Sequence, residues 1–195
     1  MGMKRAFPMV LAALVAGSAL AQSPPSAVSP AFTLGGYVEA LYSTNFNDPS
    51  NGVTNFRGFD NRVDTFSPSN VVLDANGQTG DVSAKLTLQA GLTPNTYYLG
   101  EPALAGAAGA AGSDASLWRN IQQAYVGYRA PFGKGVLFQG GLFLSPIGHE
   151  NMPVKDNWNW SRSNLFFALP FYHVGLRASR DLSANVSATL GVFNG

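Results

Sequence analysis

Ser145, His149 and Glu150 lie close together in the sequence and are the side-chain types that form hydrolytic and metal sites. A serine, a histidine and a carboxylate can form a catalytic triad, but the residues around Ser145 lack the Gly-x-Ser-x-Gly pattern that exposes such a nucleophile. His149-Glu150 also matches the start of a His-Glu-x-x-His zinc motif, yet position 153 is proline and no second histidine has the required spacing. Polar contacts within a loop, or simple solvation, explain these residues equally well. The sequence therefore predicts no catalytic, cofactor-binding or metal-binding residues and no enzyme.

The first 21 residues have the features of an export signal. Lys4 and Arg5 precede an apolar run over residues 6–16, and Ala19-Leu20-Ala21 forms a small-residue cleavage site. The apolar run is shorter than the roughly 20 residues that a membrane-spanning helix needs. We therefore predict a signal peptide over 1–21, a disordered Pro/Ser-rich linker over 22–32 and a folded portion over 33–195.

The composition is unusual for a water-soluble domain. Charged residues make up 12% of the chain, against about 25% in soluble proteins. The chain has no cysteine, so an exported protein of this sequence is not held together by disulfides. Two of the 12 basic residues lie in the leader, which leaves ten against 11 acidic residues. This balance argues against a nucleic-acid partner.

Seven segments alternate between apolar and polar residues, as half-buried strands do. In the clearest of them, Val82, Ala84, Leu86, Leu88 and Ala90 oppose Asp81, Ser83, Lys85, Thr87 and Gln89. The predicted strands are residues 34–45, 69–76, 81–90, 120–129, 135–144, 173–179 and 185–192. No 3.6-residue apolar stripe follows the leader. The exported part is therefore expected to be all-β.

Long and short links alternate between these strands. The long links cover about 46–68, 91–119 and 145–172, and the short turns lie at 77–79, 130–134 and 180–184. In an antiparallel meander, all the long links then lie at one end, which is typical of outer-membrane barrels. The pattern predicts an antiparallel up-and-down transmembrane β-barrel. A soluble β-sandwich has the same two-residue period, but it does not predict the alternating link lengths. The Gly/Ala-rich residues 99–116 are expected to be a mobile part of the second link.

Three stretches carry a family resemblance. They read Gly36-Tyr37-Val38-Glu39-Ala40, Gln123-Ala124-Tyr125-Val126-Gly127-Tyr128, and residues 141–150 followed by Asn157, Asn159 and Ser161. In their order, they resemble the putative beta-barrel porin-2 (OmpL-like) family of bacterial outer-membrane proteins. The resemblance implies a water-filled channel in the outer-membrane lipid for passive diffusion of small hydrophilic solutes. The alternative is a non-channel barrel that acts in adhesion or structure through its long loops.

The strand count affects how much of a barrel this chain forms. An odd number of strands does not close an antiparallel barrel, and porins typically have about 16–18 strands. An open edge in lipid leaves backbone groups unpaired, at several kcal/mol each. We therefore expect residues 33–195 to be the N-terminal portion of a larger barrel. The sequence also leaves a homo-oligomer open.

The polar side chains of the strands are the expected pore lining. The hypothesis includes Glu39, Asp81, Lys85, Gln89, Gln123, Arg129 and Arg177. The third long link is long enough to fold back into the lumen, where Glu150, Lys155, Asp156 and Arg162 are the hypothesised constriction residues. Both sets mix acidic and basic groups, so no strong ion preference is expected.

Overall fold

The computed structural model describes residues 31–97, 118–133 and 135–194. The predicted signal peptide, residues 22–30 of the predicted linker and the Gly/Ala-rich segment 99–116 lie outside these ranges.

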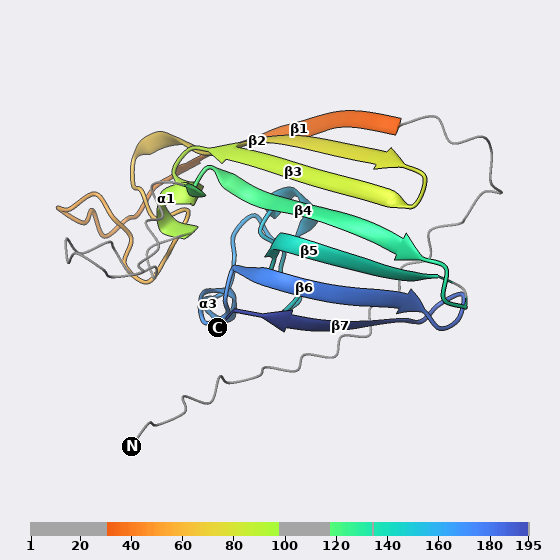
Figure 1. Cartoon of the computed structure of the whole chain (residues 1–195). Coiled ribbons are helices and arrows are strands. Elements are labelled where there is room, and N and C mark those ends of the chain that lie inside the picture. Colours follow the sequence, from red (N-terminus) through yellow and green to blue (C-terminus); the bar gives the residue numbers. More distant parts are fainter. Residues whose placement is uncertain (1–30, 98–117, 134, 195) are drawn as a thin grey trace, which may run out of the picture.

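Seven strands form one antiparallel sheet in which every strand lies beside its neighbour in the chain (Figure 1). The strands are β1 (Ala31–Ser43), β2 (Thr65–Thr79), β3 (Val82–Ala90), β4 (Ile121–Ala130), β5 (Val136–Leu144), β6 (Tyr172–Asp181) and β7 (Ser187–Phe193). The helical segments are short: α1 (Thr93–Tyr97), η1 (Val154–Asp156) and α3 (Asn164–Phe167). The all-β meander predicted from the two-residue periodicity is confirmed.

The links between strands are arranged by length. The first loop (residues 44–64), the second loop (91–120) and the third loop (145–171) all leave the same end of the sheet. The three turns, at residues 80–81, 131–135 and 182–186, lie at the opposite end, on the right in Figure 1. This is the arrangement that the alternating link lengths predicted.

The largest differences from the predicted strand boundaries are in β1 and β2, because these strands form a longer hairpin than their sequences suggest. Ala31 and Phe32 pair with Gln78 and Gly77, so β1 begins inside the predicted linker and β2 continues through the predicted turn at 77–79. The actual turn is Gly80-Asp81, where Gly80 has a φ of 55°, a conformation that glycine adopts readily. The first long link is also shorter than predicted, since β2 already begins at Thr65.

The burial of side chains on the two faces of the sheet is reversed relative to a soluble protein: apolar side chains are exposed and polar side chains are covered. One face exposes large apolar side chains along its whole width: Leu34, Leu73, Leu86, Val126, Leu176 and Leu190. The other face covers polar side chains that are at most 3% exposed: Ser69, Asn70, Thr87, Gln89 and Gln122. In a soluble sheet the apolar face would form the core. This sheet instead has the apolar outside and polar inside of a membrane barrel.

Exposed aromatic residues border the apolar face at both ends. Tyr42 and Phe66 lie at the loop end with ring centroids 5.0 Å apart, and Phe32 and Tyr128 are exposed near the turn end. Ten residues separate Phe32 from Tyr42 along β1. They span about 33 Å along the strand, or about 23 Å across a membrane at a tilt of about 45°. That height is close to the apolar band of about 25 Å in outer-membrane barrels.

None of the helices in the described ranges is long and apolar enough to cross a membrane.

Candidate pore wall and constriction loop

Most of the predicted pore-lining residues lie on the polar face of the sheet. Glu39, Lys85, Gln89, Gln123, Arg129 and Arg177 belong to strands β1, β3, β4 and β6, and all are buried or half-buried. Asp81 differs from them, because it lies in the β2–β3 turn and is exposed. The structure therefore places Asp81 at the end of the sheet and the other six residues along the wall.

The positive charge of Lys85 is neutralised within the wall by an aspartate on the neighbouring strand. Its Nζ lies 3.1 Å from Oδ1 of Asp74 on β2 and donates to Oδ1 of Asn76 at 3.3 Å. The hydroxyl of Thr87 donates to the same oxygen of Asp74 at 2.5 Å. Sequence reasoning omitted Asp74, although its place between Leu73 and Ala75 already assigned it to the polar face.

Arg177 on β6 packs against the aromatic rings of the neighbouring strands β4 and β5. Its Nε donates to Oε1 of Gln139 at 2.8 Å. The guanidinium lies 4.2 Å from the ring centroid of Phe143 and 5.4 Å from that of Tyr125. These cation–π contacts fix a positive charge on the surface of β4–β6.

Gln122 is a wall residue that the sequence did not reveal. Its Nε2 donates to Oε1 of Gln89 at 3.0 Å, and it is only 1% exposed. Simple alternation assigns Gln122 to the apolar face with Ala124, but the register shifts between Thr87 and Leu88. Such a bulge sets two residues against one and re-aims a side chain, so Gln122 and Gln123 both belong to the wall.

The third loop crosses the polar face from β5 to the far edge of the sheet. Nη2 of Arg162 lies 3.7 Å from Oε2 of Glu39, and Nζ of Lys155 lies 5.5 Å from the ring centroid of Tyr37. Both partners are on β1, whereas the loop joins β5 to β6. In Figure 1 the blue-green loop correspondingly passes behind the strands. The loop therefore lies over the polar wall.

Arg162 is the most enclosed of the four residues hypothesised for the constriction. It is 7% exposed, its Nη2 donates to the carbonyl of Met152, and its guanidinium lies over the rings of Phe59 and Phe166 at 4.7 and 5.6 Å. Burial lowers the pKa of Arg162, and the nearby carboxylate of Glu39 acts against this shift. Arginine has a high enough ordinary pKa to remain charged here.

The other three constriction candidates have different surroundings. Glu150 is half-buried and accepts from the backbone N–H of Ser163 at 2.8 Å and also from its hydroxyl. Lys155 and Asp156 are exposed, and their charged atoms lie 2.7 Å apart. Glu150 therefore supports the start of α3, whereas Lys155 and Asp156 present their charges to solvent.

An aromatic cluster joins the first loop to the third. Its buried members are Phe59 from the first loop with Met152 and Phe166 from the third, and it is surrounded by Trp118, Leu144, Phe167, Phe171 and Tyr172. The ring centroid of Phe59 lies 5.5 Å from that of Phe171 and 5.6 Å from that of Phe167. We call this group the loop core. The loop core therefore packs the first and third loops against each other, although its residues are about 100 positions apart in the chain.

Gly58 shows how closely the loop core is packed. A Cβ at position 58 would lie 2.2 Å from Cε1 of Phe167, well inside van der Waals contact. We expect Gly58→Val to separate the first loop from the third and to make the first loop several times more sensitive to limited proteolysis. Gly35→Ala is the control, because a Cβ there has nothing within 4 Å. Equal cleavage of both variants would contradict the packing argument.

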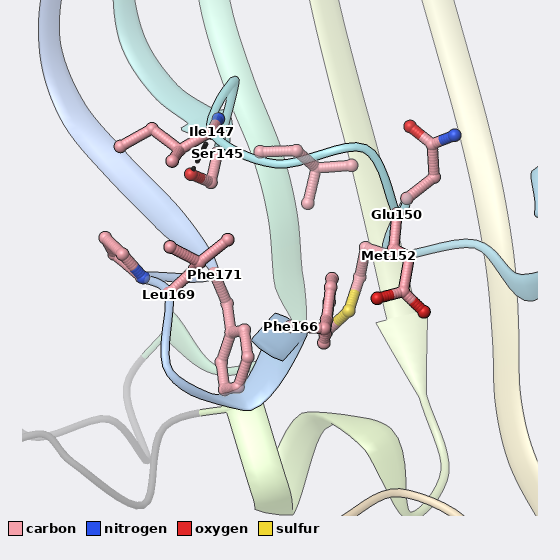
Figure 2. A pocket seen from close by; sticks show the side chains of 10 residues that line it. Ser145, Ile147, Glu150, Met152, Phe166, Leu169 and Phe171 are labelled. Atoms are coloured by element: carbon pink, nitrogen blue, oxygen red, sulfur yellow. Dashed lines mark hydrogen bonds between the residues drawn. The ribbon is translucent and has the colours of Figure 1, made fainter. Parts of the chain in front are cut away.

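The residues that suggested hydrolytic chemistry are not assembled into a triad. Ser145 Oγ lies 3.2 Å from Nε2 of His173, while His149 is exposed. A small, mostly apolar pocket within the third loop is lined by Ser145, Ile147, Glu150, Met152, Phe166 and Phe171, among others (Figure 2). Among the described residues, no group of three or more His, Cys, Asp and Glu side chains could hold a metal ion.

Comparison with known proteins identifies a family for most of the chain. The family model described as "Putative beta-barrel porin-2, OmpL-like" matches residues 31–195. No curated protein and no solved structure matches the chain. The matched range includes all seven strands and the three loops that join them.

Proposed function

Because the chain belongs to the putative beta-barrel porin-2, OmpL-like, family, we propose that it forms a water-filled outer-membrane channel for passive diffusion of small hydrophilic solutes. The observation that carries this proposal is the reversed burial of the sheet, with apolar side chains exposed and polar ones covered. An apolar outer face suits lipid, and a polar inner face suits a hydrated lumen.

The proposed lumen wall consists of the polar-face residues together with two that sequence reasoning missed. They are Glu39, Asp74, Lys85, Gln89, Gln122, Gln123, Arg129 and Arg177, with Asp81 at the turn end. Lys85 pairs with Asp74, and Glu39 lies beside Arg162. The charges of these two pairs neutralise each other and leave the positive charges of Arg129 and Arg177 in the wall, which favours a channel with no more than a weak preference for anions.

The third loop is the proposed constriction, formed by Glu150, Lys155, Asp156 and Arg162. Its path over the polar face toward β1 supports this assignment. Lys155 and Asp156 are exposed, so they are the members expected to meet a passing solute. Glu150 and Arg162 act on the shape of the loop.

The edges of the sheet support a larger barrel. Among the described residues, β1 and β7 each pair with one neighbouring strand. An unpaired edge is unfavourable in lipid by several kcal/mol per backbone group. We therefore propose that further strands complete the barrel around this portion, and that the segment 1–21 directs export to the bacterial outer membrane.

The purified protein in a planar lipid bilayer tests the channel proposal. We expect discrete conductance steps once the protein has inserted. A bilayer that stays silent although insertion is verified, for example by protease protection, would count decisively against a channel.

The loop core favours a second candidate function. Its aromatic cluster lies where the first and third loops meet over the wall, so it could close the lumen of a barrel that acts in adhesion or structure through its loops. Swelling of liposomes in sugar solutions separates the two functions. An open channel admits the sugar, whereas a plugged barrel inserts without admitting it.

A further inference from the structure

We infer that the Glu39–Arg162 pair fixes the first and third loops to the barrel wall and thereby sets the width of the lumen. This inference rests on the proposed channel function. It gives Arg162 the role of a positioning residue that is held away from the solute. Arg162 is 7% exposed, whereas Lys155 and Asp156 of the same loop are exposed.

On the loop side, Arg162 contacts both of the loops that form the loop core. Its guanidinium lies over Phe59 of the first loop and over Phe166 of the third. Its Nη2 also donates to the carbonyl of Met152. A planar guanidinium can stack on rings while it donates at its edge. The side chain thus fixes the two loops relative to each other.

On the wall side, Glu39 connects this unit to two strands and to the second loop. Its Oε1 accepts from the hydroxyl of Ser69 on β2 at 2.8 Å. That hydroxyl lies 3.3 Å from Oγ1 of Thr93, the first residue of α1 in the second loop. Ser69 and Thr93 are fully buried. The first and third loops therefore contact the Glu39–Arg162 pair directly, and the second loop contacts it through Ser69.

The two charges of the pair depend on each other. Oε2 of Glu39 and Nε of Arg162 are buried and have no hydrogen-bond partner within the described residues. Their main compensation is the ion pair, in which Nη2 and Oε2 lie 3.7 Å apart. Removing one partner leaves the other charge buried and uncompensated, which is far more unfavourable than removing both. Either single substitution should therefore release the loops from the wall.

Crosslinking can measure this docking directly, because the chain has no cysteine of its own. Cysteines introduced by Tyr37→Cys and Lys155→Cys would report whether the third loop lies against β1, since Lys155 Nζ is 5.5 Å from the Tyr37 ring. With a short bismaleimide, we expect a high yield of the crosslinked product in this double-cysteine background. Adding Arg162→Gln to this background should lower the crosslinking yield at least several-fold. Arg162→Lys in its place should give a yield between that of the Arg162→Gln variant and that of the parent.

Arg57→Gln in the same cysteine background is the matched control. Arg57 is also a loop arginine with an ion pair, to Asp60, and a cation–π contact, to Trp160, but these partners lie within the loops. We expect its yield to stay near that of the parent. A yield unaffected by Arg162→Gln, in protein that still migrates as a folded, heat-modifiable band, would overturn the inference.

Conductance completes the test and separates this inference from the proposed function. We expect Arg162→Gln and Glu39→Gln to broaden the distribution of single-channel conductances, and Arg57→Gln to leave it unchanged. A parent protein that conducts nothing but crosslinks in an Arg162-dependent manner would refute the channel and retain the loop anchor. A protein that conducts, but whose crosslinking and conductance are unchanged by Arg162→Gln, would support the channel and refute the loop anchor.

Discussion

We expect the Leu86→Arg variant to fail to accumulate as a folded membrane protein. Leu86 is at the centre of β3, is 41% exposed on the apolar face, and pairs with Ala75 and Ala124 on its two sides. An arginine on the lipid face of a barrel near the bilayer midplane costs about 2–4 kcal/mol. That is a large fraction of the roughly 5–15 kcal/mol by which proteins are usually stable. The measurement is the heat-modifiable folded band in the outer-membrane fraction.

Ser83→Arg is the control for this variant. Ser83 is on the same strand but on the polar face, where it is half-buried, so a new arginine there can extend into the lumen. We expect this variant to fold in the membrane. A soluble β-sandwich predicts a different result, because an exposed leucine on a soluble surface can be replaced at a cost within about 0.5 kcal/mol. Normal accumulation of Leu86→Arg, with protein recovered without detergent, would therefore refute the membrane assignment of this face.

The strands could be predicted from the sequence wherever one face of the strand is apolar and the other is polar. Along most of β3, β6 and β7, apolar and polar residues alternate with the two-residue period, and these strands were assigned to within two residues of their ends. The end of β2 was not, because Asn76-Gly77 is a residue pair that also favours turns, so Gly77 and Gln78 were assigned to one. Pairing with Phe32 and Ala31 keeps them in the sheet. That information lies in a partner more than 40 residues away.

The wall residues were predictable from the same period, and the loops were not. Gln122 was missed because a bulge changes the register, and alternation in a single strand carries no signal of a bulge. The burial of Arg162 depends on Phe59, about 100 residues earlier in the chain. The Phe-rich segments FRGFD (56–60) and NLFFALPFY (164–172) are the only hint of this contact. Their pairing could have been suspected from composition, but its geometry could not.

Removing residues 154–160 and bridging the gap with two glycines should increase the single-channel conductance about twofold or more, since channel conduction is limited at the constriction. This segment contains η1 and places Lys155 over Tyr37 on β1, so its loss should widen the passage. The deletion retains Glu150, Met152 and Arg162, and therefore the contacts that hold the loop core together.

The double substitution Lys155→Gln and Asp156→Asn separates the width of the passage from its charge. These two residues are paired with each other and exposed, so the substitution removes a cation and an anion without shortening the loop. We expect it to alter the preference between cations and anions only slightly and to leave the largest permeating sugar in liposome swelling unchanged, whereas the deletion should admit larger sugars. If the deletion leaves both conductance and the sugar limit at the parent values, the third loop does not form the constriction, and the narrowest point must lie along the strands of the wall.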